Sequence, residues 1–353
     1  MTKPFHRDRR RDVMDDGERL AERLSLFLLA QLGDDAAVRL ESVPRRAGGG
    51  SSKEHWAFDA SWRVGGTRRV VPLLLRRDPS AGVVDTATEV EFRLLKALEG
   101  TPVPAPTALW ADSTGEWLRR PFLLMERGRG RAARAALQDA DPLALGRDGR
   151  ARLAASLADA LADLHAVDTA VSGVADVLPD PGADPGAAEL ERWAAELDAV
   201  ELEPQPALRW VLLWLRDHVP PPVPSALVHG DARPANVLVH EGQLELLLDW
   251  ELAHLGDPCD DLGWYTCSVY EREHTVPGTF KCSDFLARYC ERSGREVNDD
   301  RLRFWQVLST FRLAVIALTG VRNAVDGTTT RPAAAPEALV RRALRDALGR
   351  EAP

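Results

Sequence analysis

Two aspartates and an asparagine stand beside short, very apolar runs in LVHGDARPANVLVHEGQLELLLDWELAHLGDP, which covers residues 227–258. Asp231 and Asn236 lie in the loop after the first run, and Asp249 follows the run LELLL. Bare carboxylates beside buried runs are costly unless they are paired or bind an ion. Carboxylate and amide oxygens are hard ligands suited to Mg²⁺, which completes its octahedron with phosphate oxygens. These residues therefore indicate metal-assisted chemistry on a phosphate group.

Short strands on either side of these residues would bring them together. The runs ALVHG and NVLVH predict two strands, and LELLLDWEL predicts a third after a turn at Glu241-Gly242. Asp231 then lies in a loop, and Asp249 lies across a hairpin from Asn236. The three side chains can converge in the folded chain although the sequence separates them.

The motif HGDARPAN followed by LLDWE resembles the catalytic loop and metal-binding segment of the aminoglycoside phosphotransferase family. That family includes choline-kinase-like enzymes and is related to the protein kinases. By this resemblance Asp231 is the catalytic base that orients and deprotonates an acceptor hydroxyl, and Asn236 and Asp249 are Mg²⁺ ligands. Glu251 would add an indirect contact to the ion or a contact to a second ion.

The continuation LGDPCDDLGW is similar to the branch of this family associated with acyl-CoA dehydrogenases. The resemblance implies that Asp257 and Asp261 accept hydrogen bonds that hold the catalytic loop. Two nearby residues allow two interpretations each. Trp264 could line an acceptor pocket, although we favour core packing, and Arg233 could contact a phosphate or form an ion pair within its lobe.

Upstream of the motif, the sequence predicts an antiparallel sheet with one helix. Helical spacing of apolar residues over 16–32 predicts an opening helix that ends at Gly33. A second helix is predicted over 86–99. The predicted strands are 37–43, 54–64, 68–76, TALW and 122–126. Pro72 indicates an edge position or irregular pairing for the third strand, and the order is β-β-β-α-β-β.

The resemblance implies that this sheet carries nucleotide-binding groups. The run AGGGSS, residues 47–52, lies between the first two strands, where backbone N–H groups can approach a triphosphate. We expect this contact from Gly48, Gly49, Gly50, Ser51 and Ser52. The run LLMERG matches the family's hinge, which implies contacts to adenine from the backbone of Glu126 and Arg127.

The cation for the α- and β-phosphates departs from the common pattern, which is a lysine on the third strand paired with a glutamate on the next helix. None of the four lysines lies on that strand; they are Lys3, Lys53, Lys96 and Lys281. The strand ends in Arg76-Arg77, and the acyl-CoA-dehydrogenase-associated branch resembles this chain in having arginine there. Arg76 is therefore assigned the phosphate role. Glu91 is its expected partner, and Glu89 is the alternative.

After residue 127 the pattern changes to Ala- and Leu-rich helical periodicity, clearest over 148–167. We expect an α+β, bilobal, protein-kinase-like fold in three parts. They are a flexible tail over 1–12, an N-lobe over 13–127 with the sheet and its helix, and a mostly helical C-lobe over 128–353. The resemblance implies an enzyme that uses ATP and Mg²⁺ to move the γ-phosphate to a hydroxyl of a small molecule.

Two other functions stay open. A kinase of a Ser or Thr in a peptide precursor would carry the same motifs, because the C-terminal helices choose the acceptor in such folds. A non-catalytic, nucleotide-binding pseudokinase is the third hypothesis, since the strand lysine is missing. The intact Asp231, Asn236 and Asp249 speak against it.

Composition argues against some classes of partner. The 353 residues include 45 Lys+Arg against 54 Asp+Glu, and a net charge of −9 argues against nucleic-acid binding. The apolar stretch 20–32 is too short and too interrupted for a membrane span. Four cysteines without a C-x-x-C pair indicate reduced thiols, and no secretory signal is evident, so we expect a cytoplasmic protein.

Overall fold

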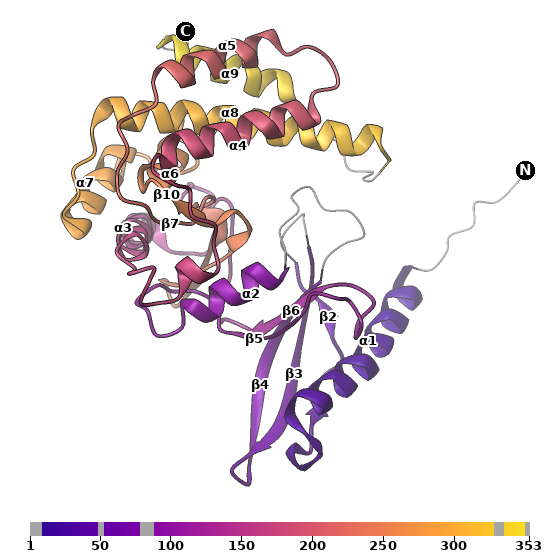
Figure 1. Cartoon of the computed structure of the whole chain (residues 1–353). Helices are drawn as coiled ribbons and strands as arrows, with labels where there is room; N and C mark the ends of the chain where they lie inside the picture. The colour runs from indigo at the N-terminus through magenta and orange to yellow at the C-terminus, as the bar shows by residue number, and fades with distance from the viewer. Residues whose placement is uncertain (1–8, 49–52, 78–87, 328–334, 350–353) are drawn as a thin grey trace, which may run out of the picture. The chain divides into compact units, whose positions relative to one another are not determined.

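The computed structural model describes residues 9–48, 53–77, 88–327 and 335–349, with side chains from Asp16 onward. The chain divides into two compact units. The sheet unit comprises Pro106–Arg127 and the described residues up to Phe92. The helical unit comprises Arg93–Ala105 and the described residues from Gly128 onward. Figure 1 shows the elements of each unit.

The sheet unit contains one antiparallel sheet in the order β1-β3-β4-β6-β5, and β2 also pairs with β3. Its elements are α1 (Arg9–Leu32), β1 (Arg39–Leu40), β2 (Arg45–Arg46), β3 (Glu54–Val64), β4 (Thr67–Arg77), the first half of α2 (Thr88–Ala97), β5 (Ala108–Asp112) and β6 (Phe122–Glu126). The predicted order β-β-β-α-β-β is confirmed, with β2 added.

The long hairpin of β3 and β4 is the largest part of this sheet. Gly65 and Gly66 form its turn with φ of 55° and 82°, the left-handed conformation that a tight hairpin requires. The inward side chains of the hairpin pack against α1, which lies beside the strands in Figure 1. This core includes Leu24, Phe27 and Leu28 of α1 with Trp56, Phe58, Leu73 and Leu75 of the hairpin. The packing covers one face of the sheet with a helix.

The first predicted strand is shorter than its pattern indicated. Only Arg39–Leu40 pairs with β3. The backbone N–H groups of Glu41 and Ser42 both turn to one acceptor, the Asp59 carbonyl, at 2.8 and 3.3 Å. The ladder is therefore interrupted, and pairing resumes at Arg45–Arg46.

β4 is an inner strand, but Pro72 lies beyond the end of the β4–β6 ladder, where that side of β4 is a local edge. Its pairing with Asp59 of β3 is regular, so of the two expectations the edge position is the one that agrees with the structure. β4 pairs with β6 only from Leu73 to Arg77, and Pro72 lies just beyond this ladder. Its carbonyl still accepts the backbone N–H of Arg127 at 2.9 Å. The missing proline N–H therefore falls where the β4–β6 ladder has already ended.

The division of the chain differs from the expected lobes in one segment. Residues 93–105 belong to the helical unit rather than to the N-lobe. The backbone N–H of Leu247 donates to the Pro104 carbonyl at 2.6 Å, and Arg93 donates to the Asp176 carbonyl at 3.0 Å. At the other end, α1 begins at Arg9, inside the tail expected over 1–12, and the first eight residues lie outside the described part of the chain.

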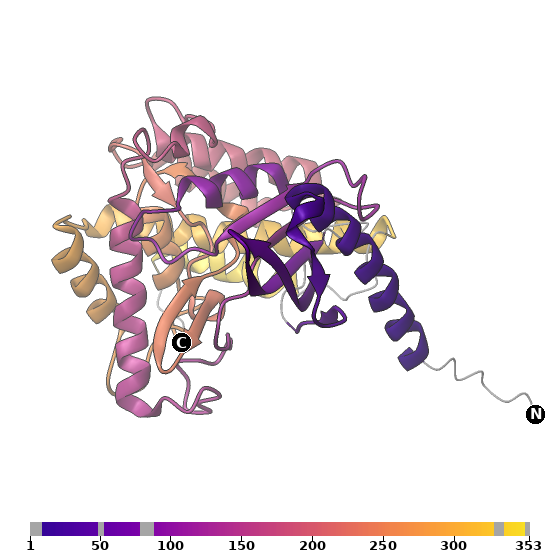
Figure 2. The same ribbon diagram turned by 90° about the horizontal axis from the view of Figure 1, so that it is seen from below.

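The helical unit combines helices with two small antiparallel ribbons, β7 with β10 and β8 with β9. Its elements are α3 (Gly146–His165), α4 (Pro185–Val200), α5 (Pro206–Asp217), β7 (Ala226–Val228), β8 (Val237–His240), β9 (Gln243–Leu247), β10 (His254–Gly256), α6 (Cys259–Thr266), α7 (Cys282–Ser293), α8 (Asp299–Val325) and α9 (Pro336–Leu348). Figures 1 and 2 both place α7 beside α3. The three predicted strands of the motif are present, and β10 adds one that the sequence did not indicate.

α8 is the core helix of this unit and packs against α4, α5, α6 and α9. Its 27 residues are long and apolar enough to cross a membrane, but 67% of its most apolar window is buried inside the protein. We therefore interpret α8 as a core helix. No other helix in the described part of the chain passes the same test.

Candidate active site

The loop that carries Asp231 begins where β7 ends, and a glycine shapes it. Gly230 has a φ of +81°, and a Cβ at this position would lie 2.5 Å from the carbonyl oxygen of Leu252. Only glycine accommodates both the left-handed backbone and this close approach. The turn between β7 and Asp231 therefore packs directly against the segment that leads into β10.

Asp261 of α6 holds the same loop. Its carboxylate accepts the backbone N–H groups of His229 and Gly230, both at 2.8 Å. His165, at the end of α3, bonds to this carboxylate at 3.1 Å and to the Tyr289 hydroxyl at 2.8 Å. Burial would raise the pKa of Asp261, but the hydrogen bond and charge of His165 and the backbone N–H groups lower it. An ionised carboxylate therefore fixes the loop within the core.

Asp257 does not share this role, contrary to what the resemblance implied. Its carboxylate accepts the backbone N–H of Cys259 at 2.8 Å and the indole N–H of Trp305 at 3.2 Å, and it pairs with Arg301. These contacts join the start of α6 to α8. Asp257 therefore organises the helices behind the loop rather than the loop itself.

Three side chains donate hydrogen bonds to the carboxylate of Asp231. Its Oδ1 accepts Nε of Arg233 and the indole N–H of Trp264, both at 2.9 Å. Its Oδ2 accepts the amide N–H of Asn236 at 2.6 Å. Arg233 thus forms the ion pair that was one of its two interpretations. Burial, with a contribution from the charge of Asp249, raises the pKa of Asp231, although Arg233 opposes the rise.

Asp249 reaches the same place from the hairpin of β8 and β9. The backbone N–H of Leu248 donates to the Asn236 carbonyl at 2.8 Å, which sets the end of β9 beside the loop. Asp249 has a φ of 70°, a conformation that is costly for a non-glycine residue and common at functional sites. Asn236 bonds through its side chain to Asp231 and through its backbone to Leu248, the neighbour of Asp249, so the three residues converge. Glu251 lies in the turn Trp250–Leu252 that follows, and its role as a ligand stays a prediction.

In the sheet unit, Glu91 of α2 is the partner of Arg76, rather than Glu89. Glu91 is 2% exposed, and one of its oxygens pairs with Arg76 of β4. Its other oxygen pairs with Lys53 at 3.2 Å. Burial would raise the pKa of Glu91, but Arg76 and Lys53 more than offset this and lower it. Lys53 lies just before β3 rather than on β4, the strand that carries Arg76, so the common pattern of a lysine on that strand does not predict its contact with Glu91.

The structure tests only part of the contacts expected for adenine and for phosphate. The backbone N–H of Glu126 donates to Thr107 and that of Arg127 to Pro72, both at 2.9 Å. Because these N–H groups are already bonded within the sheet unit, only the two carbonyls stay as candidates for the hinge. In the glycine-rich run, Gly48 is described and exposed, whereas Gly49, Gly50, Ser51 and Ser52 lie outside the described residues.

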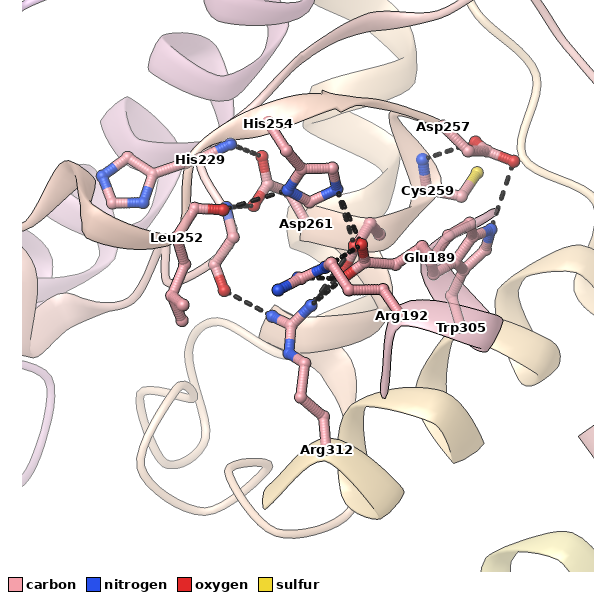
Figure 3. Close-up of polar contacts among 12 residues, drawn as sticks. Glu189, Arg192, His229, Leu252, His254, Asp257, Cys259, Asp261, Trp305 and Arg312 are labelled. Atoms are coloured by element: carbon pink, nitrogen blue, oxygen red, sulfur yellow. Dashed lines mark hydrogen bonds and ion pairs between the residues drawn. The ribbon is translucent and has the colours of Figure 1, made fainter. Parts of the chain in front are cut away.

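Figure 3 shows a second group of charged side chains in the helical unit, in which Glu189, Arg192, His254 and Arg312 point toward one another. Glu189, His254 and Asp260 bring ligand atoms within 4.8 Å of one another, a spacing that could suit a metal ion. Two guanidiniums already neutralise them: Arg192 lies 2.5 Å from Glu189, and Arg312 lies 3.0 Å from Asp260. We therefore interpret this group as an ion-pair network. Burial would lower the pKa of His254, but Glu189 and Asp260 raise it to about 8.

Comparison with known proteins shows which family this chain belongs to. The model of the APH phosphotransferase enzyme family matches residues 53–305, which is most of the chain. The chain belongs to this family. The predicted membership and the predicted class of protein, a phosphotransferase, are therefore confirmed.

Curated relatives of this phosphotransferase are named after acyl-CoA dehydrogenases. The chain is 30% identical over 266 residues to acyl-CoA dehydrogenase family member 10 of Mus musculus, which covers 70% of the chain and 24% of that protein. It is 28% identical over 265 residues to family member 11 of Gallus gallus, with 69% and 33% covered. The phosphotransferase thus spans about a quarter to a third of these relatives.

Solved structures show the fold. A candidate aminoglycoside phosphotransferase from Ralstonia eutropha is 24% identical and has a TM-score of 0.66, with 92% of this chain and 95% of that chain covered. A macrolide 2'-phosphotransferase type I is 19% identical and has a TM-score of 0.57, with 97% of each chain covered. The predicted protein-kinase-like, α+β fold is confirmed.

Proposed function

We propose that this phosphotransferase uses ATP and Mg²⁺ to transfer the γ-phosphate to a hydroxyl group of a small molecule. The convergence of Asp231, Asn236 and Asp249 in the helical unit carries the proposal. Catalysis of this kind needs little covalent work from a protein. It needs a base beside the acceptor hydroxyl, oxygen ligands for a cation and positive charge for the phosphates.

Asp231 is the proposed base. It is held from three directions, so its carboxylate has a defined orientation before any acceptor binds. Its raised pKa makes it a better proton acceptor than an ordinary aspartate, while Arg233 keeps the charged form accessible. An acceptor hydroxyl that donates to this carboxylate would be oriented for in-line attack and would lose its proton to it.

The donor set fits Mg²⁺. The amide nitrogen of Asn236 is committed to Asp231, which leaves its carbonyl oxygen as the ligand atom. The Asp249 carboxylate supplies the second hard oxygen, and Glu251 is the further candidate. The ion, when bound, would neutralise charge on the phosphate oxygens. The strained backbone of Asp249 supports this role, because strain of this kind persists where a side chain must be aimed.

Arg76 is the proposed cation for the α- and β-phosphates. Its pairing with the buried Glu91 corresponds to the lysine–glutamate pair of protein kinases, with arginine in place of lysine. Arginine keeps the charge and offers a planar fork of donors to phosphate oxygens. A structural neighbour, aminoglycoside phosphotransferase APH(4)-Ia (TM-score 0.52, 16% identical), was solved in a ternary complex with AMP-PNP and hygromycin B. That complex supports a nucleotide and a hydroxylated small molecule as the two substrates.

An ADP-release screen tests the proposal. The acceptors are aminoglycosides, macrolides, choline-like alcohols, sugars, hydroxy-acyl compounds and Ser- or Thr-containing peptides, with and without Mg²⁺. With the acceptor that works, D231N should lower turnover about 100-fold or more, because the general base is lost. ATP binding by D231N, measured by calorimetry, should stay near that of the parent.

D163N serves as the matched control, because Asp163 is a surface carboxylate that pairs with Arg292. It should leave turnover unchanged. A D231N protein as active as the parent would refute the assignment of the base. Clear ATP binding without ADP release for any acceptor would favour the non-catalytic hypothesis, and turnover with peptides alone would favour the peptide kinase.

A further inference from the structure

Trp264 joins the catalytic base to the helices behind it. Its side chain is buried, with 2% of the residue exposed, and its indole N–H donates to Oδ1 of Asp231 at 2.9 Å. The two interpretations from the sequence were core packing and an acceptor pocket. The structure adds a third, because a buried tryptophan that bonds to the proposed base can act on it without touching any substrate.

The plane of this indole is held from α8. The guanidinium of Arg312 lies 4.3 Å from the centre of the Trp264 ring, and Arg312 is itself 1% exposed. Arg312 also pairs with Asp260 at 3.0 Å and donates to the Gly230 carbonyl in the catalytic loop. A charged group stacked on an aromatic ring and bonded on both sides has little freedom. One arginine therefore fixes both the loop and the ring.

A glycine allows this close arrangement. A Cβ on Gly263, the residue before Trp264, would lie 2.5 Å from the Trp305 side chain and 2.6 Å from its backbone. Tyr270, in the segment after α6, also contacts the Trp264 ring, with the two ring centres 5.5 Å apart in an edge-to-face contact. The indole is thus enclosed by α6, by α8 and by the segment after α6.

We propose that Trp264 is a positioning residue for phosphoryl transfer, set in place by Arg312. The inference rests on the proposed role of Asp231. Each carboxylate oxygen can accept about two hydrogen bonds. Within the described residues, Trp264 and Arg233 occupy both positions on Oδ1, whereas Asn236 occupies one on Oδ2. Trp264 therefore directs the acceptor hydroxyl to Oδ2.

The kinetic test removes only the N–H donor. W264F should lower kcat for ADP release about tenfold, since a hydrogen bond to a charged group contributes on that scale, and it should leave the KM for ATP within about twofold. Replacement by β-(3-benzothienyl)alanine, which keeps the double ring but has no N–H, should give the same result and covers the case in which phenylalanine disturbs packing.

W305F is the matched control. Trp305 is equally buried, and its indole N–H donates to a different carboxylate, that of Asp257, at 3.2 Å. W305F should lower stability and leave kcat unchanged. Equal losses of kcat in the two variants would mean that Trp264 has only a structural role, and would overturn the proposal.

A spectroscopic readout separates this proposal from the proposed function. In ¹⁵N-tryptophan-labelled protein, the Trp264 indole peak is assigned by its absence from the Trp264 variants. We expect it to move upfield and to exchange faster with solvent in D231A, and to stay in place in D163N. An unmoved peak in D231A overturns the inference whether or not the enzyme turns over. Absence of turnover in the parent protein would instead count against the proposed function.

Discussion

At the scale of single residues, Glu91 shows how this protein neutralises the charge of a buried carboxylate. Two cations share it: Arg76 of β4 pairs with one oxygen, and Lys53, just before β3, pairs with the other. A lone ionised carboxylate at this depth would be strongly disfavoured. Because both partners are present, removing one still leaves Glu91 neutralised. This makes the phosphate role of Arg76 testable without loss of the fold.

R76M should weaken the binding of Mg·ATP about tenfold or more, as expected when a charge-assisted contact to phosphate is lost. Isothermal calorimetry measures the change. R77M is the matched control, because Arg77 is the next residue of β4 and pairs with Glu54 instead, at 2.6 Å.

Two results would contradict the assignment of Arg76. One is R76M protein that binds Mg·ATP as tightly as the parent. The other is loss of binding in K53M but not in R76M, which would move the phosphate role to Lys53.

At the scale of elements, the crossing of α6 and α8 positions the loop that carries Asp231. Every residue of α6, from Cys259 to Thr266, is buried. The helix carries Asp261, which holds the loop backbone, and Trp264, which bonds to Asp231. Gly263 lets the backbone of α8 approach α6 closely. Any side chain at this position would separate the two helices.

G263A should lower the free energy of unfolding by about 1–3 kcal/mol or more, because the added methyl group would overlap the backbone of Trp305. Urea unfolding followed by circular dichroism measures the loss. G186A is the control: Gly186 lies in α4, and a Cβ there would make only ordinary contacts, the nearest at 3.6 Å.

We expect G186A to be neutral or slightly stabilising, as alanine is in a helix that has room for it. If G263A unfolds at the same urea concentration as the parent, the close crossing of the helices does not limit stability.

At the scale of the whole molecule, the buried charges of the helical unit link stability to pH. His254 lies 3.3 Å from Asp260 and 3.9 Å from Glu189. Arg192 also pairs with Glu189, and Arg312 pairs with Asp260. The carboxylates raise the pKa of His254 from 6.5 to about 8. The folded protein therefore holds a proton at this site over a pH range in which the unfolded chain has released it.

Because the pKa is higher in the folded state, the stabilisation is complete below about pH 6.5 and is lost as the pH rises through about 8. The free energy of unfolding should therefore fall by about 2 kcal/mol between pH 6.5 and pH 9. H254N should remove most of this slope. H240N, which changes a half-buried histidine of β8, should keep it. An H254N protein with the parent's pH dependence would assign the effect to other groups.

Much of the fold could be predicted because its signals are local. The alternation of apolar residues and the Gly65-Gly66 pair place the hairpin of β3 and β4, and the bounds Glu54–Val64 agree with the prediction. The helical periodicity over 148–167 likewise agrees with α3, Gly146–His165. The sequence did not predict β10, because His254–Gly256 is too short to show a periodic pattern. This strand forms by pairing with β7.

The motif of the candidate site could be recognised in the sequence, because Asp231, Asn236 and Asp249 belong to one short stretch of chain, and their proposed roles stay predictions. The contacts that hold them belong to distant stretches. Trp264 is 33 residues from Asp231, Lys53 is 38 from Glu91, and Arg312 is 82 from Gly230. No period or spacing in a sequence encodes such pairs.

The order of residues thus establishes which chemistry the chain can attempt and which strands and helices surround it, because those depend on near neighbours. Only the tertiary structure shows that Lys53 is a second cation on Glu91, which indole bonds to Asp231 and which arginine holds that indole. These choices depend on packing between segments that meet only after the chain has folded, and the cost of burying an unpaired charge selects among them.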